Sequence, residues 1–215
     1  MTHSLHRRGT EESLKDDYVL LVTSAYGFNH EGSKDKMRKV LDEVFELGPS
    51  NIGSYDTGTI LSGVDIQEIR DALNDVPRVR CAFSSKEKMK QVLKRIKELD
   101  QGLSVTVSGL TEEVLDIAKE LEIQPHCINL SLEIWGNVKE LPSEEVLELV
   151  TMCGHGLISS GLVEDCIEKI KKGRMTAKDA AVKISHPCVC GIYNPDRAEK
   201  LLEKYVPQKE QEELA

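Results

Sequence analysis

The residues best suited to chemistry are cysteines and histidines, and they gather in the second half of the chain. Five of the six cysteines lie after residue 126, and each of the three histidines there stands within two residues of a cysteine. They form three short motifs, PHC at 125–127, MCGHG at 152–156 and HPCVCG at 186–191. Thiolate and imidazole groups at this density are typical ligands of zinc and of iron–sulfur clusters.

Two of these motifs contain glycine and fall between segments of helical pattern. Glycine gives the backbone the freedom to turn several sulfurs toward one point, and backbone N–H groups in such turns can donate to thiolates. A purely apolar role does not call for cysteine beside glycine. We therefore expect Cys153, Cys188 and Cys190 to bind a shared cofactor.

The cofactor that this pattern favours is an iron–sulfur cluster, of the [4Fe–4S] type. Three cysteines would leave one iron for a histidine, for Cys127 or for a substrate. No C-x2-C-x2-C run is present, so an electron carrier of ferredoxin type is not indicated. The expected role is redox chemistry or activation of a ligand held between the two halves of the chain.

Two alternatives stay open. Cys153, His155, Cys188 and Cys190 are a reasonable Cys3His set for zinc in a binding module, although C-x-H and C-x-C are tighter than the usual C-x2–4-C spacing. A metal-free interaction module belongs to the same alternative. The other is thiol-based redox chemistry at Cys188 and Cys190, because the helix that begins at Asn194–Pro195 would lower a nearby thiol pKa.

Two polar loops in the first half could contribute to such a site. The loop YGFNHEGS follows a buried strand, where α/β proteins place ligand loops, and makes His30 a candidate acid–base residue beside His155. The loop NIGSYDTGTILSG offers Tyr55, Asp56 and Thr57. Neither loop is a phosphate-binding glycine motif, and the chain has no G-x-S-x-G or H-E-x-x-H motif.

The elements that must position these residues fall into two units. Apolar runs and amphipathic segments alternate over 18–136, which predicts an α/β domain with a four- or five-stranded sheet flanked by helices, with parallel strand pairs. A ferredoxin-like split arrangement is the close alternative. Four capped helical segments over 143–206 predict a small helical unit that carries the MCGHG and HPCVCG motifs. Residues 1–17 and 207–215 read as polar tails, the first loosely held.

Within the α/β unit the expected strands are YVLLVTSA, VRCAFSS, LSVTVSG and CINLSLEIWG, with a short strand near 59–61. Cys81 and Cys127 fall in two of these strands and Cys166 on a helix, so each is expected in a core. Trp135 is expected to pack between the two units.

Composition narrows the function classes. The formal net charge is −9 and only 4% of residues are aromatic, which argues against binding of nucleic acid. No segment has the length and hydropathy of a membrane span or a signal peptide. We therefore expect a cytoplasmic protein whose cysteines stay reduced. Its partner would be a small molecule or a redox protein.

Overall fold

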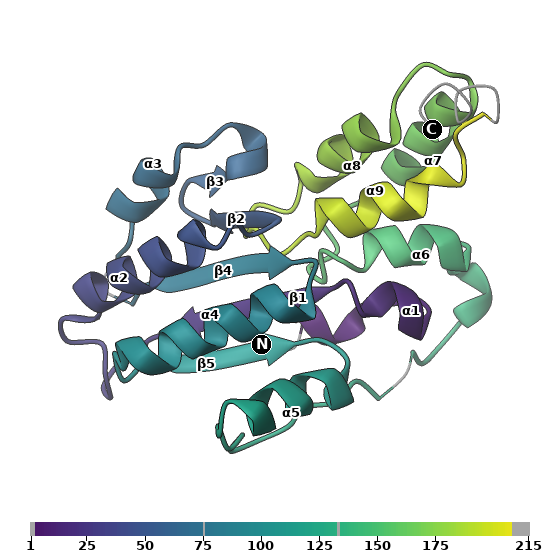
Figure 1. Cartoon of the computed structure of the whole chain (residues 1–215). Coiled ribbons are helices and arrows are strands. Elements are labelled where there is room, and N and C mark those ends of the chain that lie inside the picture. Colours follow the sequence, from purple (N-terminus) through teal and green to yellow (C-terminus); the bar gives the residue numbers. More distant parts are fainter. Residues whose placement is uncertain (1–2, 75, 133, 208–215) are drawn as a thin grey trace.

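The computed structural model describes residues 3–74, 76–132 and 134–207. Its centre is a five-stranded antiparallel sheet with the strand order β3-β2-β4-β1-β5 (Figure 1). The expected α/β architecture, a five-stranded sheet with flanking helices followed by C-terminal helices, is confirmed. The strands are β1 (Tyr18–Thr23), β2 (Asn51–Ser54), β3 (Gly58–Thr59), β4 (Arg78–Phe83) and β5 (Ser104–Ser108).

Alternate residues of the central strand β1 serve two different cores. Tyr18, Leu20 and Val22 pack on the face covered by α2 (Ser33–Glu46) and α4 (Lys86–Leu99). Val19 points to the opposite face and joins the core of the C-terminal helices. Because side chains alternate along a strand, one run of buried residues connects both layers of the molecule.

The remaining helices lie around this sheet. Two short ones, η1 and α1, precede β1, and α3 lies between β3 and β4. Helix α5 follows β5, and four helices end the described chain at one end of the sheet (Figure 1). Their bounds are η1 (His3–His6), α1 (Glu11–Leu14), η2 (Ile60–Ser62), α3 (Ile66–Asp71), α5 (Thr111–Glu120), η3 (Val138–Glu140), α6 (Glu144–Val150), α7 (Ser160–Lys171), α8 (Ala177–Ser185) and α9 (Pro195–Glu203).

The succession β1-α2-β2, then β4-α4-β5, is the split β-α-β arrangement of ferredoxin-like folds, with β3 and α3 inserted between the two halves. The expected parallel pairs are wrong, because every strand pair among the described residues is antiparallel. The expected strand pairing was wrong because strand β2 was not predicted. The sequence NIGS is short and contains glycine, so it reads as a loop, yet it supplies the second strand of the sheet.

The expected strand CINLSLEIWG is also wrong. The described residues of 124–137 belong to no strand, and Ile128, Leu130 and Leu132 are exposed. Alternating apolar residues favour a strand only where a neighbour supplies the ladder of hydrogen bonds, and β5 pairs with β1 alone among the described strands. Trp135 is 84% exposed and does not pack between the units as expected.

The four C-terminal helices have their own core of apolar side chains, and three of the four expected caps are formed by side-chain hydrogen bonds, whereas Ser143 at the start of α6 forms none. Thr176 caps α8 and Asn194 caps α9, which has Pro195 at its first position.

The N-terminal segment is not the loosely held tail that we expected from its polarity. Residues from Ser4 to Asp17 pack against both units through buried groups. Among the described residues, no helix has the length and apolar character needed to cross a membrane.

Candidate functional site

The turns after α6 and α8 bring three cysteines together. Cys153, Cys188 and Cys190 all have an exposed fraction of 0%. The sulfurs of Cys188 and Cys190 are 4.0 Å apart, and the Cys188 thiol also hydrogen-bonds to Cys153. Cys188 is therefore next to both of the other cysteines, and we call these three residues the cysteine cluster.

Local sequence explains why the chain turns at these cysteines. Gly154 and Gly156 follow α6 with φ angles of +68° and +70°, in the left-handed region that glycine adopts without strain. On the other side, Pro187 cannot continue α8, and the N–H of Cys188 bonds to the carbonyl of Ser185. Each turn thus leaves its helix axis and points its sulfur into the interior.

The second turn is pressed against the sheet at a contact between two glycines. Gly191 has a φ of +81°, and a Cβ placed on it would lie 2.2 Å from the backbone nitrogen of Gly53 in β2. No larger residue fits there without displacing backbone. This contact fixes the distance between Cys190 and β2.

An arginine from the N-terminal segment joins the two turns. The Arg7 guanidinium donates to the carbonyl oxygens of Met152, at 2.9 Å, and of Ile192, and it pairs with the buried carboxylate of Asp17. Arg197 of α9 pairs with the same carboxylate at 2.8 Å. Because one side chain holds the backbone beside Cys153 and beside Cys190, the spacing of the cysteine cluster depends on the N-terminal segment.

The cluster separates its thiols into donors and acceptors of hydrogen bonds. Hydrogen bonds from Cys188 hold the pKa of Cys153 and of Cys190 below the usual thiol range. The pKa of Cys188 is raised for the complementary reason, since its proton is shared with two neighbouring thiolates. Because Cys188 has a single S–H, it can donate to one neighbour at a time, so the arrangement favours a thiolate at Cys153 or Cys190 over one at Cys188.

A polar chain leads from the cluster to the surface. The Nδ1 atom of His155 lies 3.8 Å from the Cys190 sulfur, and its Nε2 atom is hydrogen-bonded to the Tyr55 hydroxyl. The Tyr55 ring in turn lies under the guanidinium of Arg80, 4.4 Å from the ring centroid. Burial raises the pKa of Tyr55, with a further contribution from Cys190, and burial lowers the pKa of Arg80.

The expected ligand set is thus brought together in part. Cys153, His155, Cys188 and Cys190 meet in one place, although over the described ranges no three His, Cys, Asp or Glu side chains have the geometry of a ready-made metal site.

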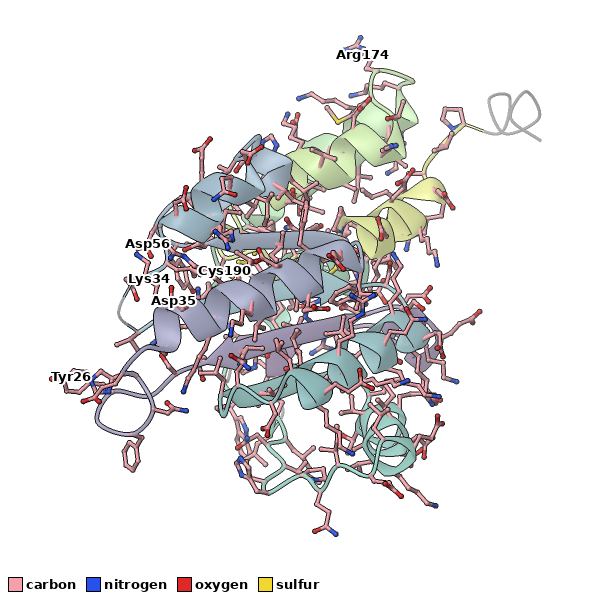
Figure 2. All side chains as sticks on the ribbon, turned by 60° about the vertical axis from the view of Figure 1, so that its left-hand side comes forward. Tyr26, Lys34, Asp35, Asp56, Arg174 and Cys190 are labelled. Carbon is pink, nitrogen blue, oxygen red and sulfur yellow. The ribbon has the colours of Figure 1, made fainter. Side chains whose placement is uncertain are left out.

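Two other residues that were expected near the site, Cys127 and His30, lie elsewhere. Cys127 is exposed and lines a cavity beside β5 whose described lining contains none of the three clustered cysteines, so it is neither the core residue nor the neighbour of the cluster that we expected. His30 stacks against Tyr26 in the loop after β1, and Figure 2 shows Tyr26 far from Cys190. This separation excludes His30 from the cluster. Cys81 and Cys166 lie in the two cores as expected.

Sequence reasoning missed Arg80 and the role of Arg7. The signal for Arg80 is present in the strand RVRCAF, where this charged residue stands between the apolar residues Val79 and Cys81, both buried. Arg7 carries no such signal, because its partners are backbone groups about 145 and 185 positions away. Comparisons of the chain with family models, with curated proteins and with solved structures found no match.

Proposed function

We propose that the protein binds an iron–sulfur cluster through Cys153, Cys188 and Cys190 and uses it to activate a small molecule or to transfer electrons. The observation that carries the proposal is the meeting of three fully buried cysteines from two glycine-containing turns. Three thiolates supply three corners of a [4Fe–4S] cluster and leave one iron open.

The surroundings support a functional centre rather than a structural staple. The helical unit already has a continuous apolar core, so it does not need a metal to fold. Arg80 places a positive charge near the thiolates, which offsets part of the negative charge of a thiolate-ligated cluster. His155 and Tyr55 connect the buried sulfurs with the surface, where a substrate or a redox partner would arrive.

One observation favours zinc as a second candidate. Around a tetrahedral zinc with Zn–S bonds of about 2.3 Å, two sulfurs lie roughly 3.8 Å apart. The 4.0 Å between Cys188 and Cys190 is close to this value, and His155 is placed to be the fourth ligand. Irons of a cluster are separated from one another, so their thiolates would need a wider spacing.

Anaerobic purification followed by metal analysis tests the proposal. We expect absorbance at about 400 nm together with about four irons and four sulfides per chain. About one zinc and no iron would select the zinc centre. Protein prepared in this way that contains neither metal, even after reconstitution with iron and sulfide, would contradict both and leave thiol chemistry at the cluster.

The matched variants are serine substitutions. Cys153→Ser, Cys188→Ser and Cys190→Ser each remove one proposed ligand, and each should lower the bound iron. Cys166→Ser is the control, because Cys166 is equally buried in the same core but lies on α7, away from the cluster. Equal iron content in the control and in all three ligand variants would contradict the assignment of the ligands.

A further inference from the structure

A small cavity beside the cysteine cluster holds a buried positive charge. It has a volume of about 130 Å³ and lies between β2, β4 and the turns next to them. Its lining includes Arg80, Arg78, Ser54, Tyr55 and Asp56. A water molecule occupies about 30 Å³ of liquid, so the cavity has room for a group of a few heavy atoms and not for a large cofactor.

Arg80 projects from the face of the sheet opposite to α2 and α4. It pairs in register with Leu21, while its neighbours Val79 and Cys81 belong to the core on the other face. The Arg80 residue is only 5% exposed. The central strand β4 therefore fixes the position of its guanidinium, which reaches the wall of the cavity without extending into bulk water.

The N–H donors of the Arg80 guanidinium have no hydrogen-bond acceptor among the described residues. Over residues 3–74, 76–132 and 134–207, the Arg80 side chain forms no hydrogen bond or ion pair; it lies over the Tyr55 ring and is within electrostatic range of Cys190 and Asp56. A guanidinium presents five N–H donors in a planar fork that matches a carboxylate or a phosphate. None of the Arg80 nitrogens is among the sealed polar atoms without a partner, so its donors face accessible space, and at the wall of this cavity they suit an anionic ligand.

The other residues that line the cavity are compatible with an anion that Arg80 holds on one side. Ser54 contributes a hydroxyl group, and Arg78 adds a second, exposed positive charge at the same cavity. Asp56 is also exposed, so its carboxylate can turn toward water rather than remain over the anion. Tyr55 belongs both to this cavity and to the polar chain that leads through His155 to Cys190.

We propose that this cavity binds a small oxyanion group, a carboxylate or a phosphate, of the molecule that reacts at the cysteine cluster. Arg80 forms the paired contact, and Arg78 attracts the anion from solution. As the subsite of a substrate this inference rests on the proposed function, whereas the binding of the anion itself does not. A substrate held by its oxyanion at Arg80 would direct its remaining atoms past Tyr55 toward His155 and Cys190.

The test is titration of the full-length protein with inorganic phosphate and, separately, with acetate, at constant ionic strength kept with chloride. Calorimetry and the rise in Tm report binding, since a ligand that binds only the folded state stabilises it. We expect saturable binding of at least one of the two anions. In Arg80→Met its affinity should fall by about tenfold or more, the loss expected for hydrogen bonds to a charged group.

Arg174→Met is the control, because Figure 2 shows Arg174 at the far end of the molecule from Tyr26 and away from Cys190. Its anion affinity should equal that of the unmodified protein. If Arg80→Met does not fold, Arg78→Met answers the same question, since Arg78 lines the cavity from an exposed position. The affinity should then fall by a smaller but measurable factor.

The absence of saturable binding of both anions overturns the proposal, and so does an affinity that is unchanged in Arg80→Met or, where that variant does not fold, in Arg78→Met. The titrations are carried out on metal-free protein and on protein reconstituted with iron and sulfide. Anion binding by protein that takes up no iron on reconstitution would refute the proposed cluster and keep the subsite. Bound metal without anion binding would keep the proposed cluster and refute the subsite.

Discussion

The contact between Gly191 and Gly53 allows a prediction whose size follows from the structure. Replacing Gly191 by alanine places a Cβ 2.2 Å from the nitrogen of Gly53 and 2.5 Å from the carbonyl carbon of Ile52. It also puts an L side chain at a φ of +81°, which costs about 1–2 kcal/mol. Overpacking against backbone adds about 1–3 kcal/mol. The expected loss of unfolding free energy is therefore about 2–5 kcal/mol.

Gly156→Ala is the matched control for this prediction. Gly156 has a φ of +70° in the other turn of the cluster, but a Cβ there meets nothing within 4 Å. Its cost should be the backbone contribution alone, about 1–2 kcal/mol. Urea denaturation of both variants isolates the packing contribution, and in Tm the cost is about 2–4 °C per kcal/mol for a chain of this length.

Equal losses in the two variants would refute this reasoning, because they would mean that Gly191 is not pressed against β2. If the proposed metal centre is present, Gly191→Ala has a second consequence. The displaced turn carries Cys190, so the variant should also bind less iron than Gly156→Ala does. Stability and metal content therefore report on the same contact independently.

Three further predictions concern groups around the cluster. Arg7→Met should cost about 3–5 kcal/mol, because it leaves the buried Asp17 with one of its two cations, whereas Arg8→Met, which breaks an exposed pair, should cost about 1 kcal/mol or less. Asn194→Ala should cost about 1–2 kcal/mol through loss of the α9 cap. Burial raises the pKa of Tyr18 from 10.0 to about 12, so Tyr18→Phe should gain stability relative to the unmodified protein as the pH rises from 10 to 12.

Denaturation measurements check all three. The sign for Tyr18 follows from linkage: the folded state holds the phenolic proton more tightly, so its contribution is complete below pH 10 and is lost as the pH rises through about 12. A difference between variant and unmodified protein that stays constant with pH would contradict it. Similar losses in Arg7→Met and Arg8→Met would contradict the role of Arg7 in holding the two turns.

Much of the fold was predictable because it depends on local pattern. The apolar run of β1, the amphipathic periods of α2 and α4 and the caps of α8 and α9 are short-range signals, and all were located from sequence. Two segments were predicted wrongly: the residues of strand β2 were read as a loop, and residues 127–136 were read as a strand. NIGS forms a strand because β4 and β3 pair with it, and the described residues of 127–136 form none because β5 does not pair with them.

The candidate site also has one part that the sequence predicted and one part that it did not. Cysteine beside glycine in two helix-ending turns pointed to Cys153, Cys188 and Cys190, because both the reactive groups and the turn residues are visible in single short motifs. Arg80, Tyr55 and Arg7 could not be placed by such motifs. Their roles arise from contacts across the sheet and across more than a hundred residues of chain.

The sequence by itself therefore determined which side chains could bind a cofactor and where the chain turns to present them, since composition and backbone freedom are local properties. Only the tertiary structure decided that the two turns meet and that Arg7 holds them together. It also placed a buried arginine with free donors beside them. Burial and pairing depend on which distant segments pack together, and no short stretch of sequence specifies that.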